Sequence, residues 1–222
     1  MALLAETQKV QVQNERKTNT DVRQETVVPV LAFGVDGVLA NSTKALLELL
    51  PEPSYDWTSL ASYEKRRIEN DTKSVKSKTA GFYESIPAFT DVDFEGLSYQ
   101  IAGGEFLANF IDCRENLHTG DRFSDDAGYS TRQWFAKNGL TEANVISDVS
   151  PDLVPFLLNI LHCSAFLTDD PLLYERISSS KTRPYLINRP WNREPHCRSC
   201  RRVGSVNEFV DAALAEHDTN QN

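Results

Sequence analysis

Two apolar segments of the chain end in acidic residues, and these acids are the side chains best placed to do chemistry. Residues 27–33 form a seven-residue apolar run that leads into the turn Gly-Val-Asp-Gly at 34–37. Residues 164–168 lead in the same way into Asp169 and Asp170. Open α/β sheets bind ligands beyond the carboxyl ends of their strands, and paired carboxylates supply the oxygen ligands that hard cations prefer. The pattern predicts a ligand or cation site where these segments end.

The segments that must position these acids are predicted alternately as strands and helices. A continuous apolar run such as 27–33 is typical of a strand buried on both faces of a parallel sheet. We predict strands over 27–33, 105–111, 144–146, 164–168 and 184–187, helices over 43–50, 131–137, 152–161 and 207–214, and an amphipathic helical patch within 54–80. This alternation predicts a Rossmann-like, three-layer α/β/α fold with a parallel sheet.

The segment around Asp36 resembles motif I of the haloacid dehalogenase-like phosphatases, in which apolar residues lead into Asp-x-Asp-Gly. Asp36, Gly37 and the following Val-Leu pair match that motif, whereas Gly34 stands where the first aspartate is found. The resemblance implies that the first aspartate attacks phosphorus and that the second acts as acid and then as base. Asp36 is then a vestigial acid/base, and Gly34 replaces the nucleophile.

Residues 164–171 resemble motif IV of the same family, an apolar strand that ends in paired acids. In the family these acids hold a magnesium ion that faces motif I. The resemblance therefore implies a metal set of Asp36, Asp169 and Asp170.

Three more segments are similar to the nucleotidase-like branch of the family, which includes relatives of the 5′(3′)-deoxyribonucleotidases. The Arg-Pro-Trp-Asn segment at 189–192 resembles the stretch that follows motif IV there, and residues 202–209 fit the closing stretch. Residues 81–89 resemble the segment that leaves the small helical cap. These matches occur in the order expected for the branch.

The resemblance also implies how the chain is divided. We expect a core over residues 27–42 and 104–216, interrupted by a small helical cap insertion over 43–103. Residues 1–26 are polar and charged and show no sustained periodicity, which predicts a flexible tail. Residues 217–222 are expected to form a second, frayed tail.

Two other motifs depart from the family's pattern. Motif II should end in Thr or Ser, but here the strand is followed by Asp-Cys-Arg at 112–114, and an anionic Asp112 would repel phosphate. Motif III should supply a lysine, but residues 146–152 contain neither Lys nor Arg, and Lys137 and Lys181 are the nearest candidates. The ligand contacts that the resemblance leaves are Gly37, Asp112, Arg114, Arg189 and Arg193.

Loss of the nucleophile and of both phosphate-stabilising groups predicts impaired catalysis, because each missing group commonly costs about 10²–10³-fold in rate. We expect a nucleotidase-like pseudoenzyme that acts as a binding or assembly module, with a nucleotide or another phosphate as its ligand. One alternative is a Mg²⁺-dependent phosphomonoesterase, a phosphoric monoester hydrolase that acts on nucleotides by an altered route. Another is a structural component of a larger assembly, docked through residues 1–26.

The three acids at 36, 169 and 170 leave two interpretations open. They could bind Mg²⁺ weakly, or they could be satisfied by the amino-terminal amides of the next helix without a metal.

Residues 189–202 are the basic segment of this acidic chain, with five arginines. They suit an anionic ligand or an acidic protein partner, and equally ordinary salt bridges to neighbouring acids. Cys197 and Cys200, next to His196, are half of a zinc ligand set. A redox pair and reduced surface thiols are the other interpretations, and the surrounding sequence favours reduced thiols.

Composition limits the remaining functions. The formal net charge of −9 argues against general nucleic-acid binding, and no apolar run is long enough to span a membrane. Four unevenly spaced cysteines do not resemble a disulfide framework, and the first residues do not resemble a signal peptide. We therefore expect a cytoplasmic protein that does not bind membranes.

Overall fold

A parallel sheet forms the centre of the molecule. The computed structural model describes residues 27–50, 56–76, 82–113, 126–193 and 199–221, and these form a six-stranded sheet in the order β3-β2-β1-β4-β5-β6. Every pair of neighbouring strands is parallel. The strands are β1 Val30–Gly34, β2 Leu107–Ile111, β3 Asn144–Ile146, β4 Ala165–Thr168, β5 Arg183–Ile187 and β6 Arg202–Val203. The predicted Rossmann-like α/β fold is confirmed.

The first strand lies in the middle of this sheet. Leu31 of β1 pairs with Ala108 of β2 on one side and with Ala165 of β4 on the other. The chain order changes direction between β1 and β4, because β2 and β3 extend the sheet one way and β4 to β6 the other. This arrangement brings the residues after β1 and those after β4 to the same edge of the sheet, where α/β proteins bind ligands.

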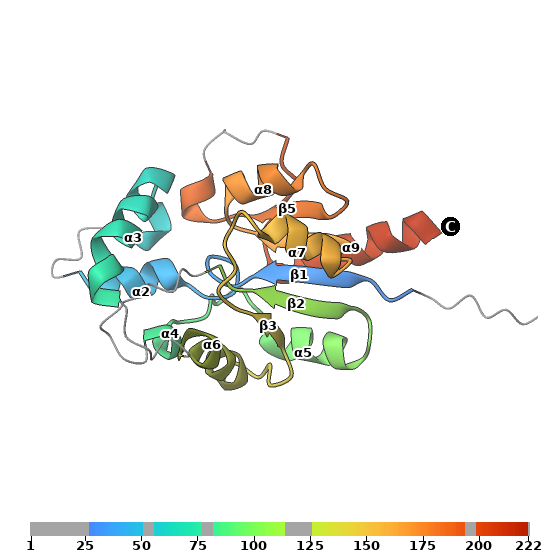
Figure 1. Ribbon diagram of the computed structural model, residues 1–222, viewed down its shortest axis with the longest axis horizontal. Coiled ribbons are helices and arrows are strands. Elements are labelled where there is room, and N and C mark those ends of the chain that lie inside the picture. Colours follow the sequence, from blue (N-terminus) through green and yellow to red (C-terminus); the bar gives the residue numbers. More distant parts are fainter. Residues whose placement is uncertain (1–26, 51–55, 77–81, 114–125, 194–198, 222) are drawn as a thin grey trace, which may run out of the picture.

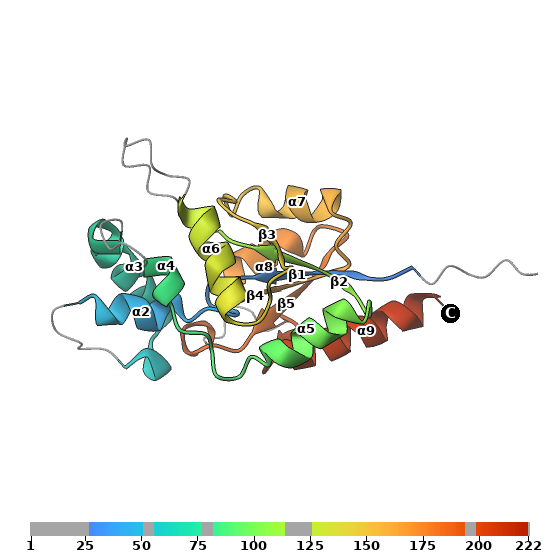
Figure 2. The ribbon, with the colours of Figure 1, turned by 90° about the horizontal axis from the view of Figure 1, so that it is seen from below.

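Helices cover both faces of the sheet. Successive side chains of β1 point alternately into the two helix layers. Leu31 and Phe33 are fully buried in one core with aromatic residues of α6 and α9, whereas Ala32 faces a second core beneath α7 and α8. Figure 2 shows α7 and α8 on one side and α5 and α9 on the other. These helices are α5 Phe94–Ala102, α6 Asp126–Lys137, α7 Val154–Ile160, α8 Pro171–Ile177 and α9 Val206–Gln221.

Further elements lie beyond the carboxyl edge of the sheet, and we refer to them together as the cap (Figure 1). They are α2 Ser42–Glu48, the 3₁₀ turn η1 Trp57–Ser59, α3 Ser62–Lys76 and α4 Phe82–Ser85. A second 3₁₀ turn, η2 Pro190–Asn192, belongs to the core and follows β5. Helix α5 lies against the sheet beside α9 and not with α2 and α3 (Figure 2), and the division with a cap insertion over 43–103 stays a prediction.

The carboxyl-terminal end of the chain also differs from its prediction. Residues 217–221, expected to be frayed, continue α9, and the Nε2 atom of His217 lies 2.7 Å from the backbone oxygen of Val27. Packing of Phe209, Val210 and Ala213 on the sheet anchors this helix. None of the helices in the described ranges is both long and apolar enough to cross a membrane.

Candidate functional site

A cavity of about 330 Å³ opens at the carboxyl ends of β1 and β4, between the sheet and cap helix α3. Phe166, Ile111 and Trp191 contribute apolar walls. Its charged lining residues are the carboxylates of Asp36, Glu69, Asp169 and Asp170 and the cations of Lys65 and Arg66. The cavity therefore lies where the sequence predicted a ligand site, and negative charge exceeds positive charge in its lining.

The loop after β1 is a tight turn that presents Asp36 to this cavity. The amides of Leu39 and Ala40 donate to the carbonyl of Val35, and the amide of Gly37 donates to the carbonyl of Ala40. Gly37 has a φ of 73°, a backbone conformation that residues with a side chain adopt rarely. Its Cα also faces the carboxylate of Asp169 at close range, since a Cβ there would lie 2.0 Å from Oδ2. Gly37 thus serves the packing of the two acidic loops.

Asp169 is the centre of a buried polar cluster. Its Oδ2 atom accepts a hydrogen bond from the Lys65 ammonium at 2.9 Å and another from the Trp191 indole at 2.9 Å. The Lys65 Nζ atom also lies 4.9 Å from the centre of the Trp191 ring, a cation–π geometry. The side chains of Lys65 and Asp169 are 17% and 9% exposed, so this ion pair is largely shielded from water.

The Lys65 ammonium is held in its charged form. Burial opposes the charge, but the nearby carboxylates of Asp169 and Glu69, with a smaller contribution from Asp36, outweigh it and raise the pKa of Lys65 above its ordinary value. Lys65 lies three residues before the buried Ile68 on α3, so helical spacing places it on the inward face. No pattern in the sequence marks Lys65 as a site residue.

The Arg-Pro-Trp-Asn segment at 189–192 holds the site in place through hydrogen bonds from its polar side chains. The Asn192 amide donates to the carbonyls of Asp169 and Ile187, at 2.9 and 2.8 Å, and so links η2 to the acidic loop. The Arg189 guanidinium donates to the carbonyls of Gly37 and Val38, both at 2.8 Å. This segment therefore fixes both acidic loops from one side.

Arg189 was predicted to contact a ligand, but it does not line the cavity. Its guanidinium also donates to Asp91 and stacks 3.7 Å from the centre of the Phe89 ring, and the residue is 5% exposed. The structure uses this arginine to hold the loop after β1 in place. Arg193, the other predicted arginine of this segment, is exposed and also lies outside the lining of the cavity.

Gly34, in the position of the expected nucleophile, is the last residue of β1 and borders the cavity. A Cβ added to it would lie 3.3 Å from the carbonyl oxygen of Leu167 and 3.3 Å from a methyl group of Val38. These contacts are tighter than normal van der Waals packing. A side chain at position 34 would therefore require Leu167 or Val38 to shift by a few tenths of an ångström.

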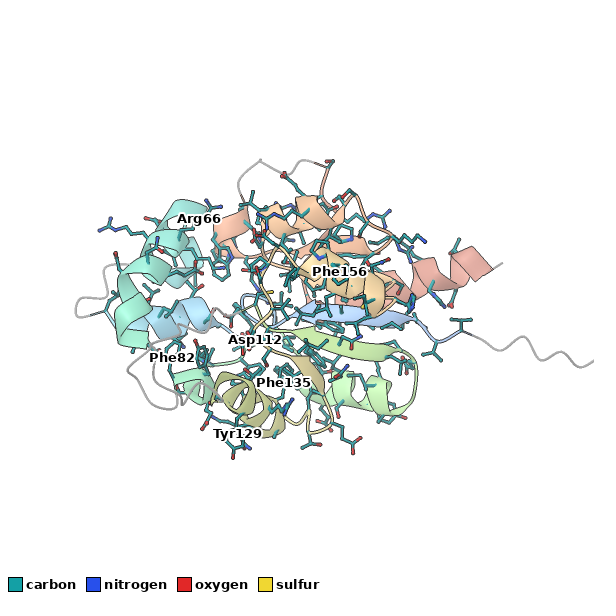
Figure 3. All side chains as sticks on the ribbon, in the orientation of Figure 1. Arg66, Phe82, Asp112, Tyr129, Phe135 and Phe156 are labelled. Atoms are coloured by element: carbon teal, nitrogen blue, oxygen red, sulfur yellow. The ribbon has the colours of Figure 1, made fainter. Side chains whose placement is uncertain are left out.

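Asp112 follows β2 and is buried, with 1% exposure, between the sheet and the cap (Figure 3). Its Oδ2 atom accepts a hydrogen bond from the hydroxyl of Thr131 on α6 at 2.7 Å. It does not line the cavity, so a ligand there would not meet its carboxylate directly. Arg114, which was also predicted as a ligand contact, lies outside the described residues.

Cys113, next to Asp112, does line the cavity. Burial, together with the charges of Asp112 and Asp36, raises the pKa of its thiol to about 12. The thiol is therefore protonated near neutral pH and is a poor nucleophile. Cys200 is disulfide-bonded, contrary to the expectation of a reduced thiol at this position, and Cys197 lies outside the described residues.

The predicted metal ligands do not form a set that fits Mg²⁺. Gly34 supplies no carboxylate, and the Oδ1 atom of Asp170 accepts a hydrogen bond from the amide of Leu172 at 2.8 Å as the N-cap of α8. Asp169 is already paired with Lys65. Across the described ranges, no three His, Cys, Asp or Glu side chains are grouped so that they could hold a metal ion.

Neither of the two lysines considered as substitutes for the motif III lysine lies at the cavity. Lys137 and Lys181 are exposed and do not line the cavity. The cation that meets the acids comes instead from the cap, as Lys65.

Solved structures similar to this chain include several haloacid dehalogenase-like hydrolases. A HAD-superfamily hydrolase of subfamily IA, variant 1, from Geobacter sulfurreducens has a TM-score of 0.53 and 10% identity, over 83% of this chain and 99% of that one. A haloacid dehalogenase-like family hydrolase from Streptococcus pneumoniae has a TM-score of 0.53 and 9% identity, over 85% and 98%. A dehalogenase with an intermediate complex has a TM-score of 0.54 and 12% identity, over 83% and 96%.

No protein-family model matches the chain, and neither does any curated protein. At such low identity the structural likeness concerns the fold and not the activity. The chain therefore has the α/β fold of the haloacid dehalogenase-like hydrolases.

Proposed function

We propose that this chain is a pseudoenzyme of the haloacid dehalogenase-like fold, which uses the cavity beneath its cap as a binding module. The observation that carries the proposal is the packing at Gly34. The resemblance to motif I places the nucleophilic carboxylate there, whereas this chain has a glycine whose added Cβ would lie 3.3 Å from both the Leu167 carbonyl oxygen and a Val38 methyl group. Covalent catalysis through an aspartate at this position has no attacking atom.

The electrostatics of the cavity support the same conclusion. Four carboxylates and two cations line it, and the Lys65 cation is already paired with Asp169. A phosphate monoester would meet an excess of negative charge instead of the cations that stabilise phosphoryl transfer. The lining favours a neutral or cationic molecule with an apolar part that can contact Phe166 and Trp191.

The nucleotidase-like branch is the ancestry that we propose within this fold. Its support is the Arg-Pro-Trp-Asn segment, in which Trp191 and Asn192 hold Asp169 while Arg189 holds the loop after β1. The segment thus keeps the architecture of a site whose chemical groups have changed. Its role here is to hold the loops in place.

The direct test is a hydrolysis assay with p-nitrophenyl phosphate and nucleoside monophosphates in the presence of Mg²⁺. We expect no turnover above that of an Asp36→Ala variant purified in the same way. The variant serves as the control for contaminating phosphatases, because it removes the remaining acid/base carboxylate. Turnover by the unmodified chain that disappears in Asp36→Ala would contradict the proposal.

A second prediction concerns restoration of the missing carboxylate. Gly34→Asp alone is not expected to give robust hydrolysis, because its Cβ would press on Leu167 and Val38 and the motif II and motif III groups would still be missing. Each of those groups commonly contributes about 10²–10³-fold. The measurement is the same assay, with Gly34→Ala as a control for the crowding. Substantial turnover in Gly34→Asp would show that the rest of the site is competent.

A further inference from the structure

A lysine side chain from outside the sheet contacts the acidic loop that follows β4. Lys65 extends from cap helix α3 to Asp169, a residue 104 positions later that follows β4. Its Nζ atom lies 2.9 Å from Oδ2 of Asp169 and 3.6 Å from Oε1 of Glu69. Trp191 donates to the same Oδ2 atom and covers the ammonium with its ring. The ammonium is thus surrounded by two carboxylates and an aromatic face.

We propose that the ammonium of Lys65 replaces the divalent cation of this fold, so that the cavity is assembled and the cap is fastened to the core without a metal. The proposal does not depend on the absence of hydrolysis. It concerns the binding of a cation, which can be measured without any substrate.

The geometry of the acids favours an ammonium over Mg²⁺. Mg²⁺ requires near-octahedral oxygen coordination at about 2.0–2.1 Å. An ammonium requires only a few acceptors at hydrogen-bond distance, and the 2.9 Å contact between Lys65 and Asp169 meets that requirement. Because Oδ2 of Asp169 accepts from both Lys65 and Trp191, a divalent ion would have to compete with the lysine for this oxygen.

The same contact joins the cap to the core of the molecule. Lys65 belongs to the cap, whereas Asp169 and Trp191 belong to the core loops after β4 and β5. If a free metal ion neutralised Asp169, the neutralising charge would not be part of the cap. In this chain the positive charge belongs to a side chain of α3. The contact that neutralises Asp169 therefore also holds the cap on the core.

The test is Mn²⁺ binding to the full chain, followed by electron paramagnetic resonance, with Mg²⁺-dependent thermal unfolding as a second measurement. For the unmodified chain we expect a dissociation constant weaker than about 1 mM, and no change in unfolding temperature when Mg²⁺ is added. In Lys65→Met the carboxylates lose their ammonium. We expect Mn²⁺ to bind this variant at least about 10-fold more tightly, and Mg²⁺ to raise its unfolding temperature.

Arg67→Met is the matched control, because Arg67 lies on the same helix but pairs with Asp71 at the surface, where the two side chains are 69% and 56% exposed. It should bind Mn²⁺ as the unmodified chain does. Micromolar Mn²⁺ binding by the unmodified chain would overturn the proposal, as would equal Mn²⁺ affinity in Lys65→Met and the unmodified chain. If Lys65→Met does not fold without metal, the titration of the unmodified chain decides the question, and refolding of the variant by Mg²⁺ would support the proposal.

Discussion

Asp169→Asn is expected to lower the free energy of unfolding by about 3 kcal/mol, because removal of one partner of a buried ion pair leaves the Lys65 ammonium with only its longer contact to Glu69. Asparagine keeps the size of the side chain and an oxygen for the Trp191 indole, so the substitution isolates the charge. The Lys65 side chain is only 17% exposed, so water replaces the lost carboxylate only in part. Denaturant unfolding monitored by tryptophan fluorescence and circular dichroism measures the change.

The control for this prediction is Asp71→Asn, which removes the carboxylate from the exposed pair with Arg67 on the same helix. Surface pairs of this kind contribute about 0–1 kcal/mol, so the variant should be nearly as stable as the unmodified chain. A double-mutant cycle that combines Asp169→Asn with Lys65→Met gives the coupling energy of the buried pair. A coupling no larger than that of the surface pair would show that Lys65 and Asp169 do not form a shielded contact.

Gly37→Ala is the second change for which we expect a large effect. The new Cβ would lie 2.0 Å from Oδ2 of Asp169, so the loop after β1 or the carboxylate must move. The positive φ adds backbone strain of about 1–3 kcal/mol, and overpacking of a filled site commonly adds about 1–3 kcal/mol more. Movement of Asp169 would also break its contacts with Lys65 and Trp191. Denaturant unfolding measures the loss of stability.

The chain offers a matched control for this substitution at Gly104. Its φ is also 73°, but a Cβ there would meet no atom within 4 Å. Gly104→Ala should therefore show the backbone strain without the clash, and the difference between the two variants measures how tightly Asp169 packs on Gly37. Equal destabilisation in both variants would mean that the acidic loops separate easily.

The buried framework was the part of the fold that the sequence predicted well. The apolar run at 27–33 predicted a strand covered on both faces, and β1 is flanked by β2 and β4, although it spans Val30–Gly34 and leaves Val27 and Val28 exposed. The short segment that forms α5 was not predicted. It contains Gly96, and its start is fixed by a hydrogen bond from the Gly96 amide to Asp93. The two-residue strand β6 is too short to produce a periodic pattern.

The site was harder to predict, because its decisive contacts join residues that are distant in the chain. Helical spacing indicated that Lys65 shares a face with Ile68, but no local pattern indicates that its partner is Asp169. Arg189 presented the opposite difficulty. An arginine that holds backbone carbonyls and one that meets a ligand look alike in a sequence, and only the buried contacts with Gly37 and Val38 distinguish them.

The contact between His217 and Val27 has a practical consequence for experiments on this protein. It places the entry into β1 beside the end of α9, whereas the cavity opens at the opposite edge of the sheet (Figure 1). A fluorophore or surface anchor attached near either of these residues would leave the mouth of the cavity facing the solution. Immobilisation from that side is therefore suited to screening small molecules against the pocket.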